Sequence, residues 1–81
     1  MTMLAVFRSR AQAIDCVAYL KGAGIPVQTV STPQEAGVGC GLSARFDESF
    51  LTRVRFFMGK RSYSSFSGFM RRTGGGGFVY C

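Results

Sequence analysis

The side chain best suited to chemistry in this sequence is the thiol of Cys40, which stands between Gly39 and Gly41 in a segment of small residues. Glycine neighbours allow close approach to the sulfur, and nearby backbone N–H groups are able to point at an anionic sulfur species. A thiolate stabilised in this way is a nucleophile that can carry sulfur or selenium as a persulfide-type adduct. The alternative is that Cys40 is only a small apolar residue in a tight turn, and its spacing does not decide between the two.

The other two cysteines offer less chemistry. Cys16 stands inside an expected helix, where a thiol is usually a small core residue, and Cys81 follows a run of four glycines. An odd number of cysteines without C-x-x-C spacing fits neither a disulfide framework nor a zinc ribbon. We therefore expect free thiols in a reducing cytoplasm, with no metal and no cofactor.

The missing histidine and the positions of the acids and glycines reduce the number of possible function classes. The chain has no histidine, which excludes imidazole base catalysis, Cys/His triads and the commonest zinc ligand. Asp47 and Glu48 are best explained as charges at a helix N-terminus, whereas Glu35 shares a loop with Cys40. The glycine patterns match neither a dinucleotide-binding motif nor a P-loop. A carrier or binding protein is therefore favoured over an enzyme.

The net charge of +6 comes entirely from the C-terminal part of the chain. Basic and acidic side chains cancel in residues 1–48, whereas residues 49–81 contain no acid. The basic residues there are Arg53, Arg55, Lys60, Arg61, Arg71 and Arg72. Such a surface suits an anionic partner, either an acidic protein or RNA, but is equally explained as a solvated face. Nucleic acid is the weaker choice, because the aromatic residues Tyr63, Phe66 and Phe69 lack the motif of an RNA-reading sheet.

The apolar pattern predicts six elements in the order β-α-β-β-α-β. Strands are expected at residues 3–7, 27–30, 42–46 and 63–72, and helices at residues 10–21 and from 47 to about 59. Ser9 and Asp47 are expected to cap the helices, and the last strand, rich in serine and glycine, is expected at an edge. The order predicts an α+β, ferredoxin-like βαββαβ sandwich, with a four-stranded antiparallel sheet and two helices on one face.

The same pattern predicts the core faces and the domain limits. The first helix is expected to bury Ala11, Ile14, Val17, Ala18 and Leu20, and the second Phe50, Leu51, Val54, Phe57 and Met58. Residues 1–72 then form a single domain, and residues 73–81 are a glycine-rich tail or an added edge strand, because four consecutive glycines suit no regular element. The apolar run at the N-terminus is too short for a signal peptide or a membrane helix.

An ordered set of short motifs in residues 3–58 resembles a known family. The most specific members of the set are Thr32-Pro33, Glu35, Cys40-Gly41 and Arg45-Phe46. Together they resemble the short, mostly bacterial domain of unknown function described as selenium/sulfur carrier-like. The resemblance implies that Cys40 is the carrier residue and that Arg45 lies nearby. It also implies that the loop around Cys40 is shaped by Thr32, Pro33, Glu35, Gly39 and Gly41.

The resemblance implies a sulfur or selenium carrier or accessory protein that exchanges the element with a partner enzyme. The charge pattern supports an alternative, a non-catalytic interaction module whose basic C-terminal surface docks on an anionic partner. The chain departs from the family pattern at Gln34, where a basic residue is usual, and in residues 60–81, which are unlike the short closing strand expected.

Overall fold

A continuous apolar stretch forms the central strand of the sheet. The computed structural model describes residues 1–37 and 41–81, and within it β1 (Thr2–Phe7) is buried from Met3 onward. This strand pairs with β3 (Leu42–Asp47) on one side and with β4 (Phe66–Arg72) on the other. Because both faces of β1 are covered, this position favours a run without polar alternation.

The sheet has five strands, in the order β2-β3-β1-β4-β5. β2 (Gln28–Ser31) lies at one edge and β5 (Phe78–Tyr80) at the other, and all neighbouring strands are antiparallel. The predicted α+β class, with two helices and an antiparallel sheet, is confirmed, but the prediction of four strands is wrong. The prediction that β4 lies at an edge is also wrong, because β5 folds back onto it.

The glycine run at residues 74–77 makes the turn between β4 and β5. The backbone N–H of Thr73 donates to the carbonyl of Gly77 at 2.8 Å, and the N–H of Gly76 donates to the carbonyl of Thr73 at 3.1 Å. Gly76 has a φ of 90°, a conformation that residues with a Cβ rarely adopt. The glycines therefore close a hydrogen-bonded hairpin.

α1 (Arg10–Gly22) covers one face of the sheet, with a register that differs from the predicted one. Ser9 caps it as expected, since its Oγ accepts from the N–H of Gln12 at 3.2 Å. The buried residues are Ala13, Cys16, Val17 and Leu20, whereas the predicted Ala11, Ile14 and Ala18 are exposed. Alanines stand on several sides of this helix, so they do not indicate which face is buried. Its amphipathic pattern is correspondingly weak.

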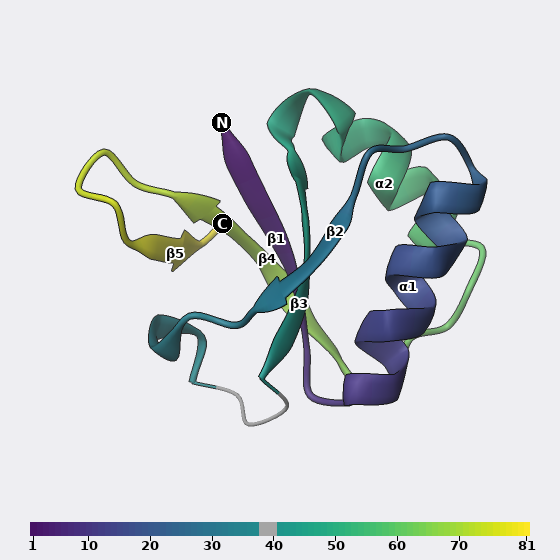
Figure 1. Ribbon diagram of the computed structural model, residues 1–81, viewed down its shortest axis with the longest axis horizontal. Helices are drawn as coiled ribbons and strands as arrows, with labels where there is room; N and C mark the ends of the chain where they lie inside the picture. The colour runs from purple at the N-terminus through teal and green to yellow at the C-terminus, as the bar shows by residue number, and fades with distance from the viewer. Residues whose placement is uncertain (38–40) are drawn as a thin grey trace.

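α2 (Leu51–Met58) lies on the same side of the sheet as α1 (Figure 1). A short 3-10 turn, η2 (Glu48–Phe50), precedes it. The predicted apolar face is confirmed, because Val54 and Met58 are buried and the other three predicted residues pack against the same core. Neither helix, nor any other within residues 1–37 and 41–81, is long and apolar enough to cross a membrane.

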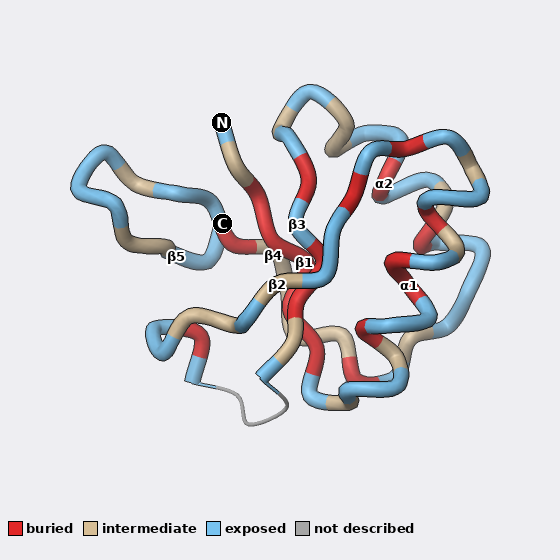
Figure 2. The backbone as a smooth tube through the Cα atoms, viewed as in Figure 1, coloured by how far each residue is buried: buried red, intermediate tan, exposed pale blue. Residues whose placement is uncertain are grey.

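Side chains of β1 alternate between two separate cores. Met3, Ala5 and Phe7 pack with both helices, whereas Leu4 and Val6 face the opposite side of the sheet. We call that opposite side the loop face, because the segment after β2 lies there, away from the helices (Figure 1). Buried residues follow β1 through the middle of the molecule, between the two layers (Figure 2).

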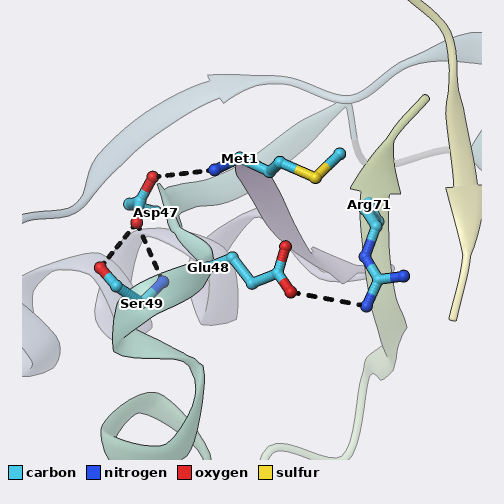
Figure 3. A network of polar contacts seen from close by, with 5 residues as sticks. All are labelled: Met1, Asp47, Glu48, Ser49 and Arg71. Carbon is cyan, nitrogen blue, oxygen red and sulfur yellow. Dashed lines mark hydrogen bonds and ion pairs between the residues drawn. The ribbon is translucent and has the colours of Figure 1, made fainter. Parts of the chain in front are cut away.

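A polar network fixes the corner where β3 leads into η2 (Figure 3). Asp47 caps the turn, because its Oδ2 accepts from the N–H of Ser49 at 2.9 Å and from the Ser49 hydroxyl at 2.6 Å. Its Oδ1 accepts from the amino group of Met1 at 3.2 Å, and Glu48 pairs with Arg71 at 3.7 Å. The bonds from Ser49, followed by that from Met1, lower the pKa of Asp47 to about 2.

The register of α1 predicts unequal effects of two substitutions on the same helix. Leu20→Ala removes a fully buried side chain and should lower the free energy of unfolding by about 2–5 kcal/mol. Ile14→Ala removes a side chain that is 49% exposed and should change it by about 0.5 kcal/mol or less. Urea denaturation followed by circular dichroism measures both. Equal losses would show that the helix packs through the face that the sequence pattern predicts.

The Asp47 network predicts sensitivity to acid. The folded-state pKa lies below the ordinary value of 3.8, so the ionised carboxylate stabilises the fold above about pH 4, and this contribution is lost as pH falls toward about 2. Asp47→Asn keeps a capping oxygen but removes the charge. The urea midpoint of this variant should therefore fall less between about pH 5 and pH 2 than that of the wild-type protein. Parallel midpoint curves would contradict the assignment.

Candidate functional site

The segment between β2 and β3 is closed into a loop at its base. The N–H of Thr32 donates to the carbonyl of Gly41 at 3.0 Å, and the Thr32 hydroxyl shares a hydrogen bond of 2.7 Å with the hydroxyl of Ser43, a buried residue. Gly41 has a φ of 79°, which suits glycine. Two residues predicted at the site, Gly39 and Cys40, lie outside the described residues. The described ends of their loop are nevertheless fixed side by side.

A short 3-10 turn, η1 (Gln34–Ala36), packs the first half of the loop onto the loop face. Pro33 precedes it with a φ of −63°, the value that its ring imposes. The N–H of Ala36 donates to the carbonyl of Pro33 at 3.1 Å. The Ala36 side chain, only 7% exposed, packs in one cluster with Leu4, Val6 and Met70. The turn therefore covers the apolar residues that the helices leave uncovered.

β5 fastens this turn from the side. The Tyr80 hydroxyl donates to the carbonyl of Ala36 at 2.8 Å, and the N–H of Phe78 donates to Oε2 of Glu35 at 3.1 Å. The second bond also satisfies a backbone donor of an edge strand, which limits the pairing of that strand with another chain. Glu35 thus accepts a structural hydrogen bond from a residue 43 positions away along the sequence.

The structure places the predicted site residues in two groups. Thr32, Pro33, Glu35 and Gly41 belong to one anchored loop. Arg45 lies four residues beyond Gly41 along β3, roughly 13 Å away in an extended strand, and its guanidinium donates to the amide oxygen of Gln28. There it lines a surface groove of about 570 Å³ together with residues that include Lys21 and Asp47.

The two described cysteines differ sharply in environment. Cys16 is completely buried, and burial, followed by the nearby Asp15 carboxylate, raises the pKa of its thiol to about 12. Cys16 is therefore a core residue, as the sequence predicts, and a poor nucleophile. Cys81 is exposed, and its Sγ donates to the carbonyl of Phe69 at 3.6 Å. Across residues 1–37 and 41–81, no three acidic or cysteine side chains gather closely enough to hold a metal ion.

Sequence reasoning missed the part that β5 plays at the loop. The signal was present, because residues 78–80 read Phe-Val-Tyr, three residue types that favour strands. The position of Gly68 was a second signal, since a glycine inside a strand often marks a bulge or a close approach. Gly68 has a φ of 136°, and a Cβ there would lie 3.3 Å from the Tyr80 ring.

The fold and the loop together define a small α+β domain with helices on one face of its sheet and an anchored loop on the other. The chain belongs to the family described as "Putative Se/S carrier protein-like", whose family model matches residues 2–64. This match confirms the resemblance seen in the sequence. It includes the loop and both helices and ends before β4 and β5. No curated protein and no solved structure matches the chain.

The contact between β5 and the loop predicts a local effect of Glu35. Glu35→Ala removes the acceptor of the Phe78 N–H, so exchange of that amide with solvent deuterium should accelerate by roughly threefold to tenfold. Gln34→Ala is the matched control, because Gln34 is an exposed neighbour in the same turn. Hydrogen exchange followed by NMR measures both amide rates. Equal acceleration in the two variants would mean that the carboxylate does not hold β5.

Proposed function

We propose that this protein carries sulfur or selenium on the thiol of Cys40 and passes it between partner proteins. The family to which the chain belongs supports the class of function. The observation that carries the proposal is the anchoring of the Cys40 loop, which is bonded at its base through Thr32 and fastened to β5 through Ala36. These contacts fix the described ends of the segment that contains Cys40.

A carrier must present its thiol to another protein, and the ends of the loop suit that task. Gly37 and Gly41 border residues 38–40, and both are exposed. Both have positive φ values, 69° and 79°, which favour glycine. Because both are glycines, neither end of the segment carries a side chain that would obstruct a docking surface. A loop whose base is already ordered also loses less conformational entropy when it binds a partner.

The thiols outside the loop are less suitable for the proposed function. Cys16 is buried in the helix-side core and its pKa is raised, so it is neither accessible nor readily ionised. Cys81 is exposed but lies beyond the region that defines the family. The family-defined region contains only one other cysteine, Cys40.

The proposed step is a thiol–persulfide exchange. The Cys40 thiolate attacks the outer sulfur of a persulfide on a donor protein, R–S–SH, and forms a new S–S bond. The old S–S bond breaks, the electron pair leaves with R–S⁻, and the product is Cys40–S–SH. The outer sulfur keeps its proton and no net oxidation occurs. Attack by an acceptor thiolate then returns Cys40 as thiolate, and selenium in the outer position follows the same balance.

This function requires partners rather than a cofactor. The donor is a protein that generates persulfide, the acceptor is an enzyme that consumes it, and the carrier itself needs little catalytic turnover. Free thiols persist in reducing compartments, so the proposed location is the cytoplasm.

We further infer that residues 1–72 follow the ferredoxin-like plan and that residues 73–81 are an addition to it. The order β2-β3-β1-β4 among the first four strands supports this inference, together with their antiparallel pairing. Each helix then connects two strands that lie on either side of a third, as in a split βαβ unit. β5 extends this framework at the β4 edge.

Glutathione persulfide tests the proposed function directly. After brief incubation and removal of the reagent, intact mass spectrometry should show one added sulfur atom on the wild-type protein, released by dithiothreitol. Cys40→Ser should lose the adduct, and the matched Cys81→Ser should keep it. Cys16 needs no replacement if labelling is confined to folded protein, because its thiol is fully buried. An adduct that persists in Cys40→Ser, or its absence from the wild-type protein, would contradict the proposal.

A further inference from the structure

A groove on the helix side of the sheet has the features of a second binding site. It has a volume of about 280 Å³ and lies between the end of α2 and the start of β4. Its lining includes Arg55, Met58, Arg61, Tyr63, Phe66 and Phe69. Since η1, the described part of the loop that leads to Cys40, lies on the other face of the sheet, the proposed carrier function does not account for this groove.

The floor of the groove is an extension of the core. The ring centroids of Phe66 and Phe69 lie 5.0 Å apart, and Phe66 lies 5.6 Å from Phe7, which is completely buried. Tyr63 meets Phe7 edge-on at 5.5 Å. Tyr63, Phe66 and Phe69 are each only partly buried, so an apolar surface with a fixed shape is open to solvent. An apolar site that is already formed costs little to order on binding.

Two arginines stand at the rim of this floor. The Arg55 guanidinium lies over the Phe69 ring, 5.5 Å from its centroid, and the Arg61 guanidinium lies 4.0 Å from the centroid of Tyr19. Arg61 also pairs with Asp15 at 2.8 Å. The Tyr63 hydroxyl donates to the same Asp15 carboxylate, and this bond is the main cause of its lowered pKa. Asp15 therefore holds one side of the groove in place.

Each acidic residue of this chain already has a polar partner. Asp15 pairs with Arg61, Glu48 with Arg71 and Asp47 with Met1, while Glu35 accepts from the Phe78 backbone. Those four are all the acidic residues that the sequence contains. Among residues 1–37 and 41–81, no ion pair joins Arg55 to a carboxylate, and its guanidinium stacks on Phe69 beside an apolar surface. Arg55 therefore leaves a positive charge at the rim that no ion pair of the described residues neutralises.

We propose that this groove binds an acidic segment of a partner protein, with one apolar side chain on the aromatic floor and a carboxylate at Arg55. The volume lies just below the range of about 300–1,000 Å³ typical of small-molecule sites, which suits a single anchoring side chain. Aromatic and arginine residues are also those that contribute most at protein interfaces. The proposal is independent of Cys40 and of the carrier function.

Three short peptides test the chemistry of the occupant on ¹⁵N-labelled full-length protein. The first is Asp-Glu-Phe-Glu-Asp, the second replaces its phenylalanine by alanine, and the third replaces its acids by asparagine and glutamine. We expect the first alone to shift the amide signals of Met58, Gly59, Phe66 and Phe69 in a saturable way. Equal shifts with either control peptide, or no shifts at low millimolar concentrations of the first, would overturn the proposal.

Two variants test the role of Arg55. Arg55→Gln should weaken binding of the first peptide by about threefold to tenfold, because an ion pair beside an apolar surface is lost. Arg53→Gln is the matched control, since it removes the same charge from the same helix, two residues away, where Arg53 stacks on Phe50. This variant should bind within about twofold of the wild-type protein. Urea midpoints of both variants establish that they fold.

Equal weakening in the two variants would reduce the interaction to general charge attraction and overturn the groove assignment. Competition with a single-stranded RNA oligonucleotide is the final arm of the test. We expect weak competition that disappears as salt is raised, because phosphate contacts are strongly salt-dependent. Displacement of the peptide by RNA at moderate salt would overturn the proposal in favour of a nucleic-acid surface.

Discussion

The arrangement of this domain depends on covering the face of the sheet that its two helices leave open. β1 buries side chains on both faces, and on the loop face Leu4, Val6 and Met70 need a cover. Removing each such aliphatic side chain from water contributes about 1.5–3 kcal/mol. The cover is the turn that contains Ala36, with Val30 and Phe78 packed at its sides. The chain after β2 therefore crosses the sheet before it returns as β3.

One side chain links this cover to an irregular site in β4. The pairing of β1 with β4 shifts register between Val6 and Phe7, opposite the part of β4 that contains Gly68. The Tyr80 ring lies over Gly68, where no side chain fills the space, and its hydroxyl reaches the carbonyl of Ala36. An aromatic residue placed over a strand glycine compensates for the packing that glycine lacks. Tyr80 thus joins the glycine of β4 to the loop.

Elements decided by local patterns could be predicted from the sequence, and those decided by distant contacts could not. The apolar run of β1, the cap at Ser9 and the spacing along α2 each express a preference within a few residues. The register of α1 could not be read from its alanines, and Ile14 lies outside the core. The sequence does not decide between a tail and a strand at β5, because a glycine run resembles a linker until the strand beyond it pairs.

At the candidate site, too, local patterns could be predicted from the sequence and distant contacts could not. The motif residues Thr32, Pro33, Glu35 and Gly41 were predicted to share a loop from their order in the family pattern, and the structure places them in one loop. The loop's contacts with β5 join residues more than 40 positions apart, which no local pattern contains. The reactivity of Cys40 stays a prediction from its glycine neighbours and from the family.

The hairpin of β4 and β5 lies outside the region that the family model matches, yet it supplies two of the bonds that hold the loop. The sequence of the loop and the contacts that hold the loop can therefore change independently during evolution. Two relatives with identical loops can differ in how freely those loops move, solely because their C-terminal hairpins differ. Mutation of residues remote from the motif thereby offers evolution a way to adjust one shared site to different partners without altering the residues that define it.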